Sequence, residues 1–362
     1  MTDSSKTMKA WEVKKFGEGI NLVRRNIPTI RRGDEILVKV KAASVNPIDV
    51  RMTEGYGNEL LSKWRQVHEM SWTSFNRLPL ICGRDLSGEI VEVGNQVNDF
   101  KVGDEIIATV PAIFDGSHAE YVVTNSTNSV RKPNNLNHVQ AVALTYTTAT
   151  AWNALCCVGR LNPENAKDSR VLIHGGSGGV GTAAIQMLKA WNTEKIVATA
   201  SKANLDVIKN LGAIAIDYND ENVKDKLIDE GPFDVILSCA DTDLSRWSDK
   251  CMGIWRNCVH VNLVSPMLRD TDRYGVPLGL MSTAFKHFER SFNSLRSGRW
   301  YSYAFFVPNK DCMNFYGEAL ETGKMKPIID EEMSFMDMPK AYEKVGKLHG
   351  RGKTVINYDL GA

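Results

Sequence analysis

The chain has 362 residues, 43% of them hydrophobic and 24% charged, a length that predicts two domains rather than one core. The formal net charge is +1, so nothing favours nucleic acid or a membrane surface as a partner. No stretch of about 18 apolar residues occurs, which argues against a membrane-spanning helix. Seven cysteines without Cys-x-x-Cys spacing indicate reduced thiols in a reducing compartment, not a zinc knuckle or a disulfide framework.

The first 130 residues favour β-structure, with strand-like runs separated by glycine-containing turns. Short strands at this spacing are typical of a partly open barrel. Between Tyr56 and Leu80 the pattern lapses, and an irregular insert is expected there. The expected strands cover 8–13, 35–45, 86–94, 104–111 and 118–124.

From about Asn137 the periodicity becomes helical, and strands then alternate with helices. Alternation of this kind predicts a parallel, doubly wound sheet with helices on both faces. The segment 325–359 mixes short strands with one helix, and we expect it to fold back onto the first domain. The expected strands are 170–176, 195–201, 213–218, 233–240, 257–264 and 303–307, and the helices are 138–155, 182–191, 203–212 and 222–229.

The strongest motif is HGGSGGVGT at 174–182, which contains Gly-x-Gly-x-x-Gly between an apolar strand and an amphipathic helix. Glycine clusters are common in turns, but the flanking strand and helix are the context that a dinucleotide site requires. Glycines allow the tight turn and let backbone N–H groups approach a pyrophosphate. The predicted cofactor-binding residues here are Gly176, Ser177, Gly178, Gly179, Val180 and Gly181.

The cofactor preference is predicted from the end of the next strand. An NAD site usually has an acidic residue about 20 positions after the glycines. Ser201 and Lys202 stand there instead, and a hydroxyl and an ammonium can bind a 2′-phosphate. A solvated lysine at a strand end is the alternative, and we expect NADPH.

Several segments together resemble the medium-chain dehydrogenase/reductase superfamily, in its zinc-free quinone oxidoreductase branch. They are AASVNPIDVRMTEGYG, GRDLSGEIVEVG, VGDEIIATVP, GGSGGVGTAAIQ, LGAIAIDY and RGKTVIN. The resemblance implies an α/β fold with a GroES-like β-barrel catalytic domain and a Rossmann doubly wound parallel-sheet domain for the cofactor. The barrel would take residues 1–134 and 318–362, and the Rossmann domain residues 135–317.

The same resemblance bears on zinc. Zinc-dependent relatives carry a histidine ligand where this chain has Arg84, and a cysteine ligand where it has Asn46. Arginine cannot coordinate a metal, because it has no free lone pair and does not deprotonate. No metal site is therefore expected. Arg84 and Asp85 would form a buried or half-buried polar pair in the old metal position, or else an ordinary exposed turn.

Further site residues follow from the resemblance alone. Asn46, Tyr56 and Thr150 are catalytic candidates, although Tyr56 could be a surface aromatic and Thr150 a helix-packing residue. The other candidates line the cofactor, with core packing or a solvated loop as the plain alternatives. They are Tyr218 at the adenosine phosphate, Leu263, Phe305 and Phe306 at the nicotinamide, and the basic residues His349, Arg351 and Lys353.

The expected function is NADPH-dependent reduction of a quinone or another conjugated carbonyl without a metal. An enoyl-thioester reductase would use the same fold, and a non-catalytic NADPH-binding partner or sensor is the rival from another class. The resemblance leaves open a peripheral membrane or reticulon-type partner and a homodimer. It also implies a mitochondrial location, although the start MTDSSKTMKAW shows no transit peptide, and the cytoplasm is the alternative.

Overall fold

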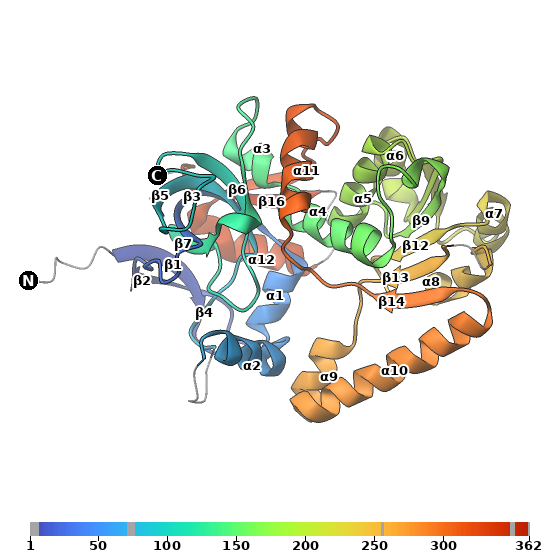
Figure 1. Ribbon diagram of the computed structural model, residues 1–362, viewed down its shortest axis with the longest axis horizontal. Helices are drawn as coiled ribbons and strands as arrows, with labels where there is room; N and C mark the ends of the chain where they lie inside the picture. The colour runs from blue at the N-terminus through green and yellow to red at the C-terminus, as the bar shows by residue number, and fades with distance from the viewer. Residues whose placement is uncertain (1–6, 71–76, 255–256, 348–351, 361–362) are drawn as a thin grey trace, which may run out of the picture.

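The computed structural model describes residues 7–70, 77–254, 257–347 and 352–360, which form two large β-sheets joined by helices (Figure 1). The first large sheet lies among the blue, teal and red segments, and the second among the green to orange ones. The first sheet therefore combines strands that are far apart in the sequence, whereas the second uses only the middle of the chain.

The second sheet is parallel throughout, with the strand order β11-β10-β9-β12-β13-β14. The chain runs outward from β9 in one direction and then from β12 in the other, so a ligand-binding crevice is expected between these two strands. The predicted doubly wound sheet is confirmed. Its strands are β9 (Arg170–His174), β10 (Lys195–Ala200), β11 (Ile214–Asp217), β12 (Val235–Ser238), β13 (Val259–Asn262) and β14 (Trp300–Tyr303). The connecting helices are α5 (Gly179–Ala190), α6 (Leu205–Asn210), α7 (Val223–Glu230) and α8 (Asp243–Trp247).

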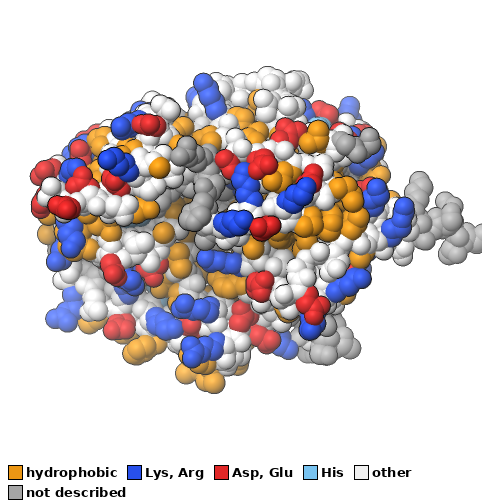
Figure 2. Space-filling model, turned by 180° about the vertical axis from the view of Figure 1, so that it is seen from behind, with side chains coloured by type: hydrophobic (Ala, Val, Ile, Leu, Met, Phe, Trp, Pro, Cys, Tyr) orange, Lys and Arg blue, Asp and Glu red, His pale blue; other side chains and the backbone are white. Residues whose placement is uncertain are grey.

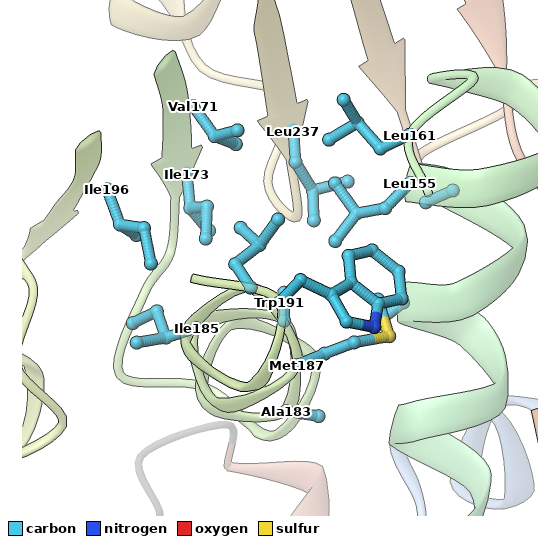
Figure 3. Close-up of a cluster of buried hydrophobic side chains, with 14 of the residues drawn as sticks. Leu155, Leu161, Val171, Ile173, Ala183, Ile185, Met187, Trp191, Ile196 and Leu237 are labelled. Carbon is cyan, nitrogen blue, oxygen red and sulfur yellow. The ribbon is translucent and has the colours of Figure 1, made fainter. Parts of the chain in front are cut away.

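The main core lies between this sheet and α5. Helix α5 contributes Ala183, Ile185 and Met187 to this core, in which Met187 and the following Trp191 point toward the helical segment that carries Leu155 (Figure 3). The indole of Trp191 meets the ring of Trp152 edge-on, with 5.9 Å between ring centroids. The apolar residues of this helix are buried as expected, but so is every position from Gly181 to Leu188, and the helix is therefore buried on all sides along this stretch and not amphipathic.

The first large sheet closes the other half of the molecule. Its strand order is β15-β16-β3-β5-β6-β8, and β7 pairs with β3 outside this path. Strand β16 runs antiparallel to β3, so the predicted return of the last segment onto the first strands is confirmed. These strands are β3 (Glu35–Val45), β5 (Asp85–Val93), β6 (Glu105–Thr109), β7 (Tyr121–Asn125), β8 (Ser129–Arg131), β15 (Ile329–Ser334) and β16 (Lys353–Asn357). A smaller sheet contains β1 (Thr7–Val13), β2 (Asn21–Asn26) and β4 (Leu80–Ile81).

Helices connect and cover the two halves (Figure 1). Helices α3 and α4 lead from the first large sheet into the second, and α11 packs against α4. They are α1 (Pro47–Thr53), α3 (His138–Val142), α4 (Thr145–Trp152), α11 (Lys310–Glu321) and α12 (Met338–Gly346).

The insert after Tyr56 differs from the expectation. It is not irregular at its start, because Asn58–His68 form the helix α2. This helix buries Leu61 and Ser62 and exposes Trp64 and Val67. Two of its large apolar residues therefore lie outside the buried face, so the apolar pattern alone does not mark that face.

The expected series lacked α1, α8 and α11, and it also lacked the two helices between β13 and β14. Helix α9 (Met267–Tyr274) leads into α10 (Val276–Arg296), which lies along the lower edge of Figure 1 beneath β14. Gly279 allows the two to pack closely, because a Cβ there would lie 2.4 Å from Thr271 Cα. The strand expected over 303–307 lies earlier, at Trp300–Tyr303. In the part of the chain that the structure describes, no helix is both long enough and apolar enough to span a bilayer.

Candidate active site

The glycine loop connects β9 to α5. A Cβ on Gly181 would lie 2.3 Å from Gly175 O, and one on Gly176 would lie 2.6 Å from Ala198 Cβ. These two glycines are therefore required by the close approach of loop, helix and sheet. A Cβ on Gly178 would meet only Gly175 O, at an ordinary 3.4 Å. The space beside Gly178 is thus left open by the protein itself.

The same loop fits a dinucleotide. Helix α5 begins at Gly179, and its N-cap, Gly178, supplies no side-chain cap. The first N–H groups of a helix have no intrahelical acceptor, and with the helix dipole they favour an anion such as a pyrophosphate. Ser177 and Val180 are half-buried beside them. The residues present therefore fit the cofactor that the motif predicted.

The first large sheet reaches this loop from the other side. A Cβ on Gly179 would lie 3.0 Å from Thr147 Cγ2 and 3.4 Å from Lys353 Cδ. Thr147 belongs to α4 and Lys353 begins β16. The start of α5 is thus the place where the two halves of the molecule meet.

The predicted adenosine site lies at the ends of β10 and β11. Ser201 directly follows β10, and Lys202 beside it is exposed. The Tyr218 N–H donates to Ala200 O at 3.1 Å, which holds the exposed Tyr218 next to Ser201. The parallel pairing of the two strands therefore brings Ser201, Lys202 and Tyr218 to one edge, as a phosphate site would require.

A buried polar cluster lies where the resemblance placed the metal. Asp85 accepts hydrogen bonds from Ser44 N at 2.8 Å, Ser44 Oγ at 2.6 Å and Asn46 Nδ2 at 3.2 Å. Asn46 in turn accepts one from Lys353 Nζ at 2.5 Å. Asn46 therefore bridges an ammonium and a carboxylate, and all four side chains are buried.

Arg84 does not belong to this cluster, which corrects the predicted pairing with Asp85. Both residues are fully buried, which agrees with the expected burial and excludes the alternative of an exposed turn. The Arg84 guanidinium, however, lies 3.8 Å from the carboxylate of Asp49 and donates to the carbonyls of Pro111 and Phe114. Arg84 directly precedes β5, whose first residue is Asp85, and the two side chains bind different partners.

Burial dominates the electrostatics of the cluster. It raises the pKa of the Asp85 carboxyl, while nearby Lys353 and the hydrogen bonds from Ser44 act in the opposite direction. It lowers the pKa of the Lys353 ammonium, and Asp85 and Asp49 oppose that shift. Both directions follow from the cost of keeping charges out of water. The cluster therefore brings an acid and a base closer in proton affinity than they are in solvent.

Thr150 is hydrogen-bonded within its own helix, and its role in catalysis stays a prediction. Its hydroxyl donates to Tyr146 O at 2.9 Å, within α4. Tyr146, one turn earlier, was missed by the sequence reasoning, although it lies in the same TYTTATAW segment. Its ring stacks on Phe306 with 4.5 Å between centroids, and burial raises the pKa of its phenol.

The predicted nicotinamide residues follow the last two strands of the parallel sheet. Leu263 comes directly after β13, and Phe305 and Phe306 come shortly after β14. All three thus lie at the carboxyl edge of the sheet, where cofactors of doubly wound folds bind. Phe305 also accepts a hydrogen bond from Asn153 through its carbonyl. Of the basic residues, His349 and Arg351 lie outside the described residues.

Tyr56 lies in a large cavity between the two halves. The cavity has a volume of about 930 Å³, and Tyr56, Val264 and Tyr303 are among its walls. The Arg51 guanidinium is 5.8 Å from the Tyr56 ring centroid, and burial raises the pKa of the phenol more than Arg51 lowers it. The remaining cations of this cavity are Arg246, Lys250, Arg269, Lys286, Arg290 and Arg299.

Comparison with known proteins agrees with this architecture. The family model described as Alcohol dehydrogenase GroES-like domain matches residues 32–134, and that described as Zinc-binding dehydrogenase matches residues 211–356. Over 98% of this chain and 96% of the relative, the sequence is 51% identical to Reticulon-4-interacting protein 1, mitochondrial, of Caenorhabditis elegans. It is 38% identical to the human NAD(P)H oxidoreductase RTN4IP1, mitochondrial, over 98% of this chain and 90% of the relative. The quinone oxidoreductase structure from Coxiella burnetii has a TM-score of 0.77 at 27% identity, covering 98% and 100% of the two chains.

The fold and the site together define an NAD(P)H oxidoreductase of the medium-chain dehydrogenase/reductase type, with a GroES-like half beside a Rossmann-like parallel sheet. The predicted fold class and enzyme class are confirmed. More narrowly, the chain belongs to the family of mitochondrial NAD(P)H oxidoreductases that includes Reticulon-4-interacting protein 1.

Proposed function

We propose that this oxidoreductase uses NADPH to reduce a quinone or similar conjugated carbonyl, without a catalytic zinc. The observation that supports the proposal is the buried cluster of Asn46, Asp85 and Lys353, in which Asn46, at a position where the resemblance implies a cysteine ligand in zinc relatives, is hydrogen-bonded to both Asp85 and Lys353. The buried Lys353 amine already donates a hydrogen bond to Asn46 there. Among the described residues, no group of three His, Cys, Asp or Glu side chains could hold a metal ion.

The chemistry of the product supports a quinone. Reducing a simple ketone produces an alkoxide, whose conjugate acid has a pKa near that of water, about 16. Reducing a quinone produces a phenolate-type anion with a pKa of about 10. At about 1.36 kcal/mol per unit, the difference is about 8 kcal/mol. Zinc relatives stabilise the alkoxide by Lewis-acid coordination. The phenolate-type anion needs less stabilisation, which hydrogen-bond donors can provide.

NADPH would supply the hydride when bound, and the residues of the chain would position it. The start of α5 would hold the pyrophosphate, and Ser201 and Lys202 would hold the 2′-phosphate. Tyr146 and Phe306 would form an aromatic wall at the carboxyl edge of the sheet. Lys353 and Asn46 would offer N–H donors at the junction of the two halves, with a Lys353 pKa already lowered by burial. The named mitochondrial relatives favour a mitochondrial location for this chain as well.

An enoyl-thioester reductase is the second candidate, and one observation favours it. The cavity beside Tyr56 is lined by cations that include Arg51, Lys250 and Arg299. A phosphate-bearing thioester carrier would find favourable charge there, whereas a plain quinone would not need it. In the third alternative, the protein would bind NADPH without turnover.

The test is to measure NADPH consumption with a panel of quinones and, in parallel, with enoyl thioesters. We expect quinone turnover and no oxidation of simple alcohols with NADP⁺. Elemental analysis should find no stoichiometric zinc, and chelators should leave the rate unchanged. Alcohol oxidation without quinone turnover, or one tightly bound zinc per chain, would refute the proposal. Turnover of thioesters alone would favour the second candidate, and tight NADPH binding with no turnover the third.

A further inference from the structure

Helix α10 exposes its apolar side. Six side chains on it are between 38% and 70% exposed, and together we call them the α10 stripe. Orange side chains project from the lower edge of Figure 2, where α9 and α10 lie. The stripe consists of Leu278, Met281, Phe285, Phe288, Phe292 and Leu295.

The polar residues of α10 face the molecule instead. Ser291 Oγ donates to Tyr301 O in β14 at 3.1 Å, and Lys286, Arg290 and Asn293 line the large cavity. A helix on the surface of a globular protein normally directs its apolar stripe inward and its polar face to water. This helix has the opposite orientation, so its stripe requires another apolar surface to cover it.

Helix α10 also covers the last strand of the parallel sheet. Strand β14 pairs with β13 on one side, and its other side meets α10 through the bond from Ser291. A covered edge does not offer free backbone groups for strand addition. The stripe therefore offers an apolar surface for association beside this edge.

The spacing of the stripe indicates what would cover it. Its residues follow one another at intervals of three, four, three, four and three positions, which is the a and d pattern of a coiled coil. Under a two-fold axis an antiparallel copy would bring Phe285 opposite Phe288 of the partner subunit, Met281 opposite Phe292 and Leu278 opposite Leu295. Every a position would meet a d position. The stripe is therefore complementary to itself.

We propose that the α10 stripe binds the same stripe of a second copy of this chain, with the two helices antiparallel. At these exposed fractions, six side chains of this size expose roughly 600 Å² per copy, and the two copies would bury roughly 1,200 Å². That area reaches the lower end for a stable interface, before any flanking contact is counted. One flank carries both Glu289 and Arg296, which suits a protein partner better than an anionic lipid surface.

The first experiment measures mass by light scattering during size-exclusion chromatography, across a concentration series of the full chain. Wild-type protein should be a dimer. Phe285→Glu should raise the dissociation constant at least about 100-fold, because a carboxylate would be buried against an aromatic ring. The matched control is Val67→Glu on α2, which changes an equally exposed apolar residue and should leave the dimer intact. Circular dichroism and NADPH binding should be unchanged in both variants.

The second experiment tests the antiparallel pairing. Phe285→Glu and Phe288→Lys should each be monomeric alone. When the two variants are mixed, one interhelical layer would pair glutamate with lysine and the other would keep two phenylalanines, so dimers should return. Failure of the mixture to dimerise would overturn the antiparallel arrangement.

A third measurement distinguishes a membrane from a second copy. A dimer that survives Phe285→Glu, or a wild-type protein that is monomeric at every concentration, would overturn the proposal. Flotation with phosphatidylcholine–cardiolipin vesicles should show no binding that depends on Phe285. Binding of monomeric wild-type protein, lost in Phe285→Glu, would assign the stripe to lipid instead.

Discussion

Two glycines of the same loop should respond in opposite ways to a side chain. Gly178 has φ −76° and ψ 169°, a conformation that valine adopts readily, and its Cβ would meet only ordinary contacts. Gly178→Val should therefore fold normally and still lose the cofactor, because the side chain would occupy the space beside α5. Gly181→Ala should instead destabilise the protein, since its Cβ would lie 2.3 Å from Gly175 O.

The magnitudes follow from these contacts. Overpacking of the kind expected at Gly181 typically costs about 1–3 kcal/mol of stability, whereas Gly178→Val should change the stability of the cofactor-free protein by less than about 1 kcal/mol. Hydrogen bonds to a charged group contribute about 1.5–3 kcal/mol each. Losing two of them at the phosphate would weaken NADPH binding at least about 100-fold, at about 1.4 kcal/mol per tenfold change.

The assay combines NADPH titration by fluorescence with urea unfolding of the cofactor-free variants. If Gly178→Val binds NADPH within about threefold of the wild type, the pyrophosphate does not lie at the start of α5. If Gly178→Val loses as much stability as Gly181→Ala, the new side chain clashes with the protein itself. A loss of NADPH binding in that variant would then not locate the pyrophosphate.

Three further predictions concern charge. The wild type should bind NADPH about tenfold more tightly than NADH, and Lys202→Ala should bring the two dissociation constants close to equality. Lys209→Ala, exposed on α6, is the control. Equal dissociation constants for the two cofactors in the wild type would contradict the 2′-phosphate site. Lys353→Met and Asp85→Asn should each lower the free energy of unfolding by about 3 kcal/mol, because each leaves a buried charge without compensation. In urea unfolding, the double variant should lose less free energy of unfolding than the sum of the two single losses. Strictly additive losses would show that the two residues are not coupled. Burial lowers the pKa of His174 to about 3, so below its unfolded pKa of about 6.5 only the unfolded chain takes up this proton. The wild type should therefore lose about 2 kcal/mol between pH 7 and pH 5 through this residue, a loss that His174→Gln should remove, and an identical pH dependence of the variant would count against this cause.

What the sequence predicted well is local. The glycine loop could be assigned because its strand, turn and helix are consecutive, and the packing around Gly176 and Gly181 agrees with the reason for those glycines. The strands of the parallel sheet were also found from their apolar runs. The predicted position of β14 was wrong because the apolar residues of YAFFV do not form the strand. Phe306, for example, packs on the ring of Tyr146.

What it could not predict depends on distant parts of the chain. The bond between Asn46 and Lys353 joins residues 307 positions apart. The return of the last segment to the first domain was expected, but no local pattern indicates that these two side chains will meet. The different partners of Arg84 and Asp85 likewise come from distant segments, Pro111 and Phe114 for the first and Ser44 for the second. The 3-4 spacing in 278–295 could have revealed α10, but an apolar stripe would then have been assigned to the core rather than to the surface.

The pairing of β16 with β3 has a consequence for synthesis of the chain on the ribosome. Strand β3 emerges roughly 300 residues before its partner, a delay of about 15–60 s at about 5–20 residues per second. All six strands of the parallel sheet emerge within that interval, so the nucleotide-binding half can mature while the other half still lacks a strand. During this time β3 has an unpaired edge, and the carboxylate of Asp85, which is buried in the finished protein, lacks nearby Lys353. A chain terminated before Lys353 would therefore be both a target for chaperones and proteases and a protein without its central polar cluster.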